Sequence, residues 1–282
     1  MPQDLAGKTY VITGANTGIG RVTATELARR GGHVIIASRS RAKTEPVVAE
    51  IQQETGSTTV EFAVLDLGDL ASVRACAAAL LARDLPIHGL INNAGLVARG
   101  TTTDGFELIF GTNHLGHYLL TRLLLDRLVA SGPARIVNVS SKSHYRAKGI
   151  DFEALRHPTR SVTGLHEYEV SKLANVLFTR ELAHRVDHTK VTTYAVHPGV
   201  VATDVWRRIP AVLRWLPMRF MLTPAQGAVA SLVTATAPAL AIETGRYYDV
   251  GGVPKHPSRV AQDEVLAKLL WERSAEWVGL PH

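Results

Sequence analysis

The hydrophobic positions of this chain fall into two alternating patterns. Short, continuously apolar runs are separated by longer stretches in which apolar residues recur with a helical period. Runs that are apolar on both faces predict buried strands, and the longer stretches predict helices. The predicted strands cover 8–13, 33–38, 59–65, 88–92, 134–140, 191–197 and 245–250, and the predicted helices cover 20–30, 42–55, 69–83, 106–129, 168–186 and 263–278.

This alternation indicates the fold class. Buried strands joined by helical crossovers form a doubly wound parallel sheet, so we predict a single α/β, Rossmann-like domain of about seven strands over residues 1–282. Ligands of such sheets bind beyond the carboxyl ends of the strands. We therefore expect the functional residues to follow the strands, and two further segments, 144–166 and 200–222, to line the substrate side of the site.

Composition narrows the function classes. The chain is 46% hydrophobic, which excludes a disordered protein, and Cys76 is its one cysteine, which excludes a disulfide framework or a cysteine-based zinc site. Its 31 basic and 25 acidic residues are scattered along the sequence, so nucleic-acid binding is not expected. No leader pattern and no run of roughly 18 apolar residues is present, so we expect a soluble, cytoplasmic protein.

The first predicted strand ends in a glycine-rich turn, Thr-Gly-Ala-Asn-Thr-Gly-Ile-Gly, at residues 13–20. Glycines allow a tight turn and let a pyrophosphate approach the amides at a helix N-terminus. Such a turn can also be purely structural, but its place between a strand and a helix favours nucleotide binding. The candidate cofactor contacts here are Gly14, Asn16, Thr17, Gly18, Ile19, Gly20 and Arg21.

The end of the second predicted strand bears on which nucleotide is bound. NAD sites usually carry a carboxylate there for the ribose hydroxyls, whereas this chain has Ser38 and Arg39. The guanidiniums of Arg39 and Arg21 would attract a 2′-phosphate. The alternative is that Arg39 and Arg41 are solvated loop charges. We expect NADP(H) rather than NAD(H) as the cofactor.

A tyrosine and a lysine one helical turn apart are the candidate catalytic pair. Tyr168 and Lys172 project from the same helix face, and a nearby ammonium stabilises the phenolate that acid–base catalysis by tyrosine requires. Ser141, at the end of the fifth predicted strand, can donate a hydrogen bond to a carbonyl oxygen. These groups suit interconversion of a carbonyl and an alcohol, with the hydride carried by the cofactor.

Together with these groups, motifs along nearly the whole chain resemble those of the short-chain dehydrogenase/reductase family. They are Thr13-Gly-x-x-x-Gly-Ile-Gly20, Asp66-Leu67, Asn92-Asn93-Ala94-Gly95, Asn113, Ser140-Ser141, Tyr168-x-x-Ser171-Lys172 and His197-Pro198-Gly199. Strand alternation lets only one of the two adjacent serines face the cleft, and the family pattern favours Ser141.

The resemblance implies specific roles for these residues. Tyr168 would donate or accept the proton, Lys172 would also contact the nicotinamide ribose, and Asn113 would interrupt its helix and hold a water that feeds a proton relay through Lys172. The implied cofactor contacts are Asp66 at the adenine, Leu67, Asn92, Ala94, Gly95, Tyr168, Lys172, Pro198, Gly199, Val201, and Thr203 at the carboxamide.

Within the family, the chain is similar to the retinol dehydrogenase-like branch. Residues 113–118, 135–141 and 171–175 carry its pattern, as does the long separation between Ser141 and Tyr168. Vertebrate retinoid members typically begin with a membrane anchor, which this sequence does not show, so we expect a soluble member. The resemblance implies a lipophilic substrate that is retinoid-like, steroid-like or an aromatic polyketide. It also implies a homodimer paired through the helices that contain Asn113 and Tyr168.

Segment 206–221 contains two tryptophans, two methionines and a phenylalanine. This composition suggests a mobile lid over a bulky apolar substrate. Core packing is the alternative, and interfacial contact with a membrane is a further one because four arginines interleave the apolar residues.

The twelve histidines do not indicate a metal site. The pairs His114/His117 and His184/His188 have helical spacing but lack the H-E-x-x-H arrangement, so we expect no metal and interpret them as internally bonded or solvated. His144 lies close to Ser141 and is open to two interpretations, substrate contact or structure.

A non-catalytic dinucleotide sensor or scaffold on the same fold is the alternative function. Such proteins often lack the Tyr–Lys pair. We favour the enzyme because Asn113, Ser141, Tyr168 and Lys172 are all retained.

Overall fold

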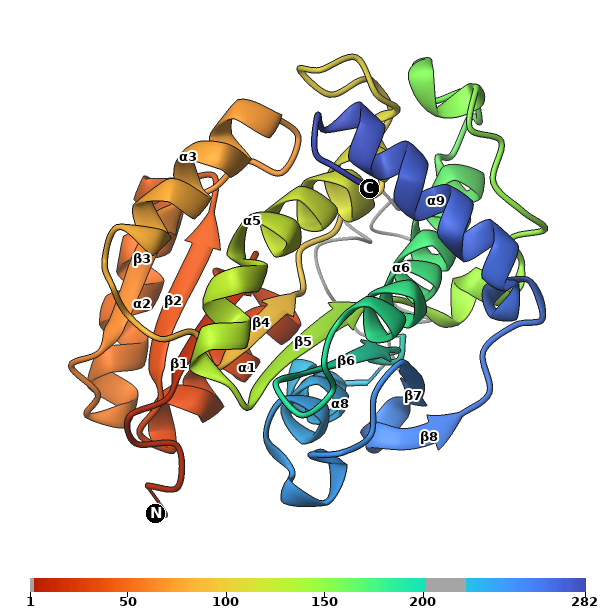
Figure 1. The fold of residues 1–282 in the computed structure, drawn as a ribbon. Helices are drawn as coiled ribbons and strands as arrows, with labels where there is room; N and C mark the ends of the chain where they lie inside the picture. Colours follow the sequence, from red (N-terminus) through yellow and green to blue (C-terminus); the bar gives the residue numbers. More distant parts are fainter. Residues whose placement is uncertain (1–2, 201–221) are drawn as a thin grey trace.

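A computed structural model describes residues 3–200 and 222–282 of the chain (Figure 1). Its strands form one sheet in the order β3-β2-β1-β4-β5-β6-β7-β8, in which only the last pair, β7 and β8, is antiparallel. This confirms the doubly wound α/β fold and adds β8 to the strands expected. The strands are β1 (Thr9–Thr13), β2 (His33–Ser38), β3 (Val60–Val64), β4 (Gly89–Asn92), β5 (Ala134–Val139), β6 (Val191–Val196), β7 (Arg246–Asp249) and β8 (Val253–Lys255).

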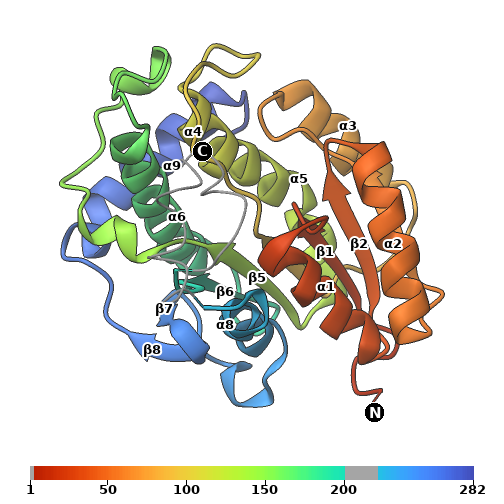
Figure 2. The same ribbon diagram turned by 180° about the vertical axis from the view of Figure 1, so that it is seen from behind.

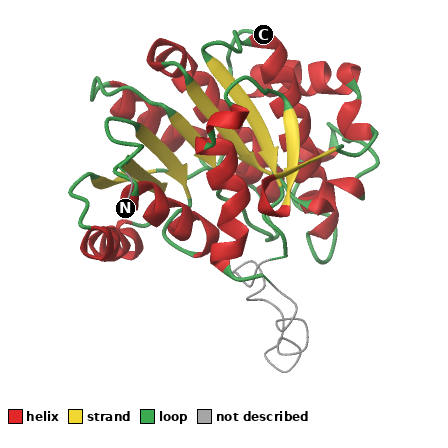
Figure 3. Cartoon of the chain, turned by 90° about the horizontal axis from the view of Figure 1, so that it is seen from below, coloured by secondary structure: helices red, strands yellow, loops and turns green. Residues whose placement is uncertain are grey.

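Helices cover both faces of the sheet (Figures 1, 2 and 3). Helices α3, α5, α6 and α9 pack on one face, and α1, α2 and α8 pack on the other. The helices are α1 (Gly18–Arg29), α2 (Arg41–Thr55), α3 (Leu70–Leu81), α4 (Leu108–Phe110), α5 (Gly116–Ser131), α6 (Leu165–Arg185), α8 (Pro224–Thr236) and α9 (Glu264–Trp277), with short turns η1 (Gly111–Leu115), η2 (Lys142–Tyr145), η3 (Ala154–Arg156), η5 (Pro238–Leu240), η6 (Val250–Gly252) and η7 (Val260–Gln262).

The core follows from the alternation of side chains along buried strands. In β1, Val11 faces the layer of α3, α5 and α6, whereas Tyr10 and Ile12 face the layer of α1 and α8. Both sets are buried, since strand side chains point to opposite faces and helices cover each face. This arrangement explains why the strands read as continuous apolar runs.

The helix predicted over 106–129 is interrupted. Residues Gly111–Leu115 form a π turn in which the Gly116 N–H donates to the carbonyl of Gly111, five residues earlier. Such turns are rare inside α-helices and occur mostly at functional sites. The turn contains Asn113, the residue that the family resemblance expected to interrupt this helix.

The closing helix α9 lies against α6, and an aromatic cluster holds it there. The Trp271 ring stacks on Phe178 of α6 at 6.0 Å and meets Tyr118 of α5 edge-on at 5.2 Å. Ser274 of α9 lies 3.3 Å from His114 Nε2. Among the described helices, none combines the length and apolarity that a bilayer crossing requires.

Candidate active site

The carboxyl ends of the parallel strands lie along one edge of the sheet, and the strand order reverses between β1 and β4. Strand β1 has β2 on one side and β4 on the other, so the connections from β1 and β4 leave toward opposite faces, and ligands of such sheets bind at this point. The glycine turn follows β1, the segment 92–95 follows β4, and Ser141 follows β5. The structure therefore brings these expected site residues together at the carboxyl edge of the sheet.

The glycine turn is crowded by backbone in a way that only glycine tolerates. Gly14 has a φ of +66°, and a Cβ there would lie 2.8 Å from the Cβ of Ala94. A Cβ at Gly20 would lie 2.5 Å from Nδ2 of Asn93 and 2.8 Å from Cα of Ala15. The turn ends at the N-terminus of α1, where amides are available to an anion. These features fit a bound pyrophosphate.

Two residues that the sequence analysis named within motifs, without giving them a role, hold this turn. Asn93 Nδ2 donates to the carbonyl of Thr13 at 2.8 Å. The Thr13 hydroxyl in turn accepts the N–H groups of Asn93 and Ala94 at 2.9 and 3.0 Å. Their places in these two motifs could have indicated the pairing, because the first strand and the fourth are neighbours in this fold class.

The end of β2 carries one arginine without a carboxylate partner among the described residues. Arg21 pairs with Glu50 at 2.8 Å, and Arg41 pairs with Glu45. Arg39 is exposed and makes no ion pair within the described ranges. Ser38 is buried and its hydroxyl lies 2.6 Å from that of Thr44, so Ser38 shapes the β2–α2 turn.

Helix α6 and the end of β5 bring the candidate catalytic groups together. The side chains of Tyr168 and Ser141 lie close together, and Ser141 acts to lower the pKa of the phenol. Lys172 places Nζ 5.4 Å from the centre of the Tyr168 ring and donates to the carbonyl of Val139 at 2.9 Å. Ser140 turns the other way and donates to the Lys172 carbonyl, so Ser141 alone of the two serines reaches Tyr168.

Burial governs the acidity of both titratable groups. Burial lowers the pKa of the Lys172 ammonium to about 8. Burial also raises the pKa of the Tyr168 phenol, and Ser141 only partly opposes this effect. The expected stabilisation of a phenolate by Lys172 is thus not visible in the chain alone.

Asn113 sits inside the π turn and is fully buried. Its Oδ1 accepts the Leu96 N–H at 2.8 Å, and its Nδ2 donates to the Leu96 carbonyl at 3.1 Å and to the Ser171 hydroxyl at 3.2 Å. A Cβ at Gly95 would lie 3.4 Å from Lys172 Nζ and 3.5 Å from Asn113 Oδ1. Asn113 is therefore next to the catalytic lysine and fixes the chain that passes beside it.

Other expected cofactor contacts differ in how they lie. Asn92 is buried and donates to Thr121 at 3.0 Å and to Asn138 at 2.8 Å, which ties β4 to β5 and α5. Asp66 Oδ1 accepts the Gly68 N–H at 2.9 Å in the turn after β3. Val201, Thr203 and the expected lid at 206–221 lie outside the described residues.

The structure favours a structural role for His144. The side chain is fully buried, its Nδ1 lies 2.7 Å from the Ser141 carbonyl, and its Nε2 accepts the Ser258 N–H at 3.2 Å. A carbonyl only accepts, so Nδ1 carries the proton. With both ring nitrogens used inside the protein, His144 holds the backbone of Ser141.

The insertion at 144–166 is held by two buried carboxylates. Glu107 is hydrogen-bonded with the hydroxyl of Thr159. Glu167 accepts the N–H groups of Arg160 and Ser161 at 3.1 and 2.8 Å. These contacts hold the insertion against the start of α6, close to Tyr168.

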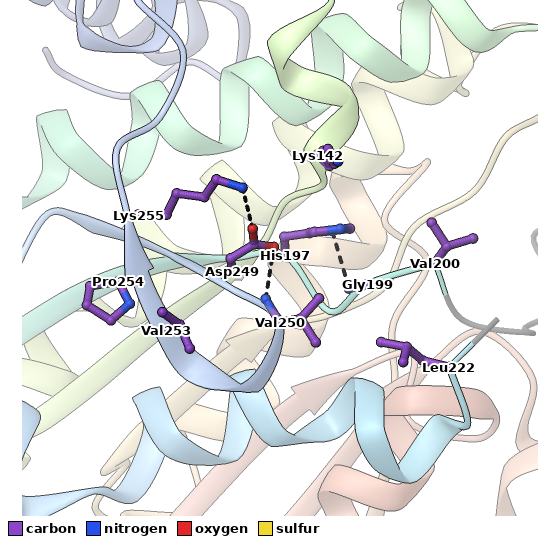
Figure 4. Close-up of a pocket in the computed structure, with 10 residues that line it drawn as sticks. All are labelled: Lys142, His197, Gly199, Val200, Leu222, Asp249, Val250, Val253, Pro254 and Lys255. Atoms are coloured by element: carbon purple, nitrogen blue, oxygen red, sulfur yellow. Dashed lines mark hydrogen bonds and ion pairs between the residues drawn. The ribbon is translucent and has the colours of Figure 1, made fainter. Parts of the chain in front are cut away.

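A pocket of about 650 Å³ lies at the carboxyl edge of the sheet (Figure 4). Its walls come from the ends of β5, β6 and β7 and from β8, and Lys142 at its rim directly follows Ser141. Asp249 pairs with Lys255 across one wall, and apolar side chains form much of the remainder. The pocket is lined by Lys142, His197, Gly199, Val200, Leu222, Asp249, Val250, Val253, Pro254 and Lys255.

No cluster of potential metal ligands occurs within residues 3–200 and 222–282. His114 and His117 use their ring nitrogens within the protein: His114 Nδ1 lies 3.2 Å from Asn175 Oδ1, and His117 Nε2 lies 2.8 Å from the Thr13 hydroxyl. Burial lowers the pKa of both imidazoles, to about 4 for His114 and about 3 for His117.

Curated relatives share this chain nearly end to end. Human retinol dehydrogenase 11 is 46% identical over 281 residues, which cover 98% of this chain and 87% of the relative. Human retinol dehydrogenase 12 is 47% identical, with 98% and 88% covered. Bovine dehydrogenase/reductase SDR family member 13 is 44% identical, with 98% and 74% covered.

Solved structures and a family model agree with these relatives. An uncharacterised protein from Mycobacterium paratuberculosis superposes with a TM-score of 0.78 at 35% identity, covering 99% of this chain and 96% of that one. A gluconate 5-dehydrogenase described as NAD(P)-dependent, from Beutenbergia cavernae with bound NADP, has a TM-score of 0.71 at 28% identity, with 89% and 98% covered. The model of the short chain dehydrogenase family matches residues 8–151. The chain therefore belongs to the short-chain dehydrogenase/reductase family and is an oxidoreductase that acts on CH–OH groups.

Proposed function

We propose that the protein is an NADP(H)-dependent oxidoreductase that interconverts a ketone or aldehyde and an alcohol on a lipophilic small molecule. One observation carries the proposal: Ser141 is close enough to Tyr168 to lower the pKa of its phenol, and Lys172 Nζ lies 5.4 Å from the centre of the Tyr168 ring. The non-catalytic alternative has no comparable support, because a scaffold does not need these three groups together.

The chemistry divides between the cofactor and the chain. A bound nicotinamide supplies or accepts the hydride. Ser141 donates a hydrogen bond to the substrate oxygen and orients it toward Tyr168, whose phenol gives or takes the proton. Lys172 supplies positive charge behind the phenol and a donor for the nicotinamide ribose. Asn113 keeps Leu96 and Ser171 in place beside Lys172 and serves the expected proton relay.

The cofactor preference rests on the β2–α2 turn. Members of the family bind a nicotinamide dinucleotide, and the glycine turn of this chain fits a pyrophosphate. Arg39 is exposed at the position where NAD sites carry a carboxylate, and no described carboxylate pairs with it. A 2′-phosphate would supply that missing partner, so we propose NADP(H) over NAD(H).

The substrate class rests on the pocket beside Ser141. Val200, Leu222, Val250 and Val253 offer apolar surface in this pocket, and Lys142 at its rim directly follows Ser141. This surface suits a retinoid-like, steroid-like or aromatic polyketide substrate, and relatives at 42–47% identity include retinol dehydrogenases.

Four other expectations from the sequence remain predictions. They are a single domain over 1–282, a cytoplasmic location, contact of segment 206–221 with substrate or a membrane, and a homodimer. For the homodimer, α9 already covers part of α6, with Trp271 on Phe178, so that helix offers a partner only its remaining surface.

The proposal is tested by following NADPH consumption against panels of retinal, steroid ketones, aromatic polyketides and simple aldehydes. The substrate found is then tested with Tyr168→Phe, which removes the transferable proton and changes the site by a single hydroxyl group. We expect NADPH binding to persist and kcat to fall by about 100-fold or more. Undiminished turnover by this variant contradicts the proposed role of Tyr168.

A further inference from the structure

A buried histidine on α5 joins the glycine turn to the π turn. His117 is 2% exposed. Its Nε2 lies 2.8 Å from the hydroxyl of Thr13, the residue that begins the glycine turn. Its Nδ1 lies 3.0 Å from the carbonyl oxygen of Asn113. The two backbone sites are 100 residues apart in the sequence, and one imidazole bonds to both.

The chemistry of the groups fixes which is donor and which is acceptor in each hydrogen bond from residues 93–94 through Thr13 and His117 to Asn113. The Asn113 carbonyl can only accept, so His117 Nδ1 must carry the proton and donate. Nε2 of a neutral imidazole is then an acceptor, and the Thr13 hydroxyl must donate to it. The Thr13 oxygen is free to accept the N–H groups of Asn93 and Ala94, as it does. The path therefore runs in one direction from residues 93–94 to Asn113.

The contact to Asn113 uses a carbonyl that lies within the π turn. Here the side chain of His117 donates to it, together with Asn175 Nδ2 at 3.2 Å. The imidazole thus stabilises the irregular helix geometry that sets Asn113 beside Lys172.

We propose that His117 is a positioning residue that couples the cofactor turn to the catalytic π turn, through its Nε2 to Thr13 and its Nδ1–H to Asn113. This inference rests on the proposed function, because it assigns His117 to that same site. A loss at Nε2 loosens the glycine turn and weakens NADPH binding. A loss at Nδ1 loosens Asn113, and with it the surroundings of Lys172.

Two amide variants separate the two halves of this role. His117→Asn places its amide nitrogen near Nδ1 and keeps the donor to Asn113 but loses the Thr13 contact. His117→Gln places its amide near Nε2 and keeps the Thr13 contact but loses the Asn113 donor. We expect the dissociation constant of NADPH to rise roughly 5- to 20-fold in His117→Asn with kcat little changed, and kcat to fall by a similar factor in His117→Gln with binding little changed.

The matched control is Thr193→Val on β6. Thr193 is also fully buried, and its hydroxyl donates to the Thr179 carbonyl at 2.8 Å, a bond that involves neither turn and no expected cofactor contact. We expect it to lower the free energy of unfolding without changing NADPH affinity or kcat. If both histidine variants resemble this control, or if their effects on binding and kcat are not split, the inference is wrong.

The tautomer gives a readout that needs no substrate. Side-chain ¹⁵N and ¹³C shifts, assigned through the signal lost in His117→Asn, should show a neutral Nδ1–H imidazole that does not titrate between pH 5.5 and 8.5. An Nε2–H tautomer, or titration in that window, overturns the inference. A wild-type protein that fails to bind NADPH contradicts the proposed function instead, so the two failures are distinct.

Discussion

The Nδ1 atom of His144 lies 2.7 Å from the carbonyl oxygen of Ser141, and its Nε2 accepts the N–H of Ser258. A buried imidazole therefore holds the backbone of Ser141, just as the imidazole of His117 holds the backbone of Asn113. Burial is the largest cause of the lowered pKa of His144. The hydrogen bond to Ser141 opposes this shift, and the charge of Lys255 adds to it. The ring thus stays neutral near pH 7 and keeps Nδ1 as a donor.

Replacing His144 should displace Ser141. His144→Phe leaves the Ser141 carbonyl and the Ser258 N–H buried without partners, which should lower the free energy of unfolding by roughly 2–4 kcal/mol and lower kcat. His144→Asn retains a donor near Nδ1 and should recover most of kcat. Urea denaturation and steady-state kinetics check both expectations, with the exposed His157→Asn as control. A fully active His144→Phe contradicts the positioning of Ser141 by this histidine.

Because of Lys172, the free energy of unfolding should rise as the pH becomes alkaline. Its pKa is lowered from 10.5 to about 8 by burial, so between these values the unfolded chain binds a proton that the folded chain has lost. Stability from this group therefore rises with pH across that window. Relative to Lys172→Met, the free energy of unfolding of the wild type should rise by about 2 kcal/mol between pH 7.5 and 9.5.

The comparison with Lys172→Met isolates the effect of Lys172, because the other titratable groups are the same in both proteins and their contributions to the pH dependence cancel. Tyr168 does not interfere, since burial raises its pKa above 10 and its effect on stability falls outside the window. Urea denaturation at a series of pH values measures the difference. A constant difference from pH 7.5 to 9.5 would show that the Lys172 ammonium is not disfavoured in the folded state.

The fold was predictable because the strands are buried on both faces. The run 33–38 predicts β2 with its observed bounds, His33–Ser38. β8 gave no such signal, because Val253–Lys255 is short and all three residues are exposed. The helix predicted from Tyr168 begins earlier, at Leu165. Its N-cap is Gly164, with a φ of +72°, so no polar capping side chain marks the start in the sequence.

The site was predictable where residues lie close in sequence or form known motifs. The spacing of Tyr168 and Lys172 sets their common face, and the glycines of 14–20 mark the turn after β1. The contacts of His117 with Thr13 and of His144 with Ser258 join residues that are distant in sequence, and no local pattern encodes such a pairing. The pattern therefore supplied the catalytic groups but not the histidines that hold them.

Reversing the charge at Arg39 should reverse the cofactor preference. A charge-assisted hydrogen bond to a 2′-phosphate contributes about 1.5–3 kcal/mol, so Arg39→Asp should weaken NADPH binding by roughly 10- to 100-fold and leave NADH binding unchanged or improved. Arg41→Asp is the matched control, because Arg41 already pairs with Glu45 and lies over Phe62. Fluorescence titration with both cofactors measures the ratio. An unchanged preference for NADPH in Arg39→Asp contradicts the assignment.

Gly14→Ala tests whether the crowding of the glycine turn is what adapts it to a pyrophosphate. The variant combines a positive φ with a Cβ placed 2.8 Å from that of Ala94, so the turn and the segment after β4 must move apart. Gly56→Ala has a similar φ, +72°, but open space around the new Cβ, and it should lose only about 1 kcal/mol of unfolding free energy. Gly14→Ala should lose more stability than this control and, unlike the control, should bind NADPH at least tenfold more weakly, because the displaced amides no longer converge on the phosphates. Equal stability losses with equal NADPH affinities would mean that φ alone, and not the close approach to Ala94, makes glycine necessary at this position.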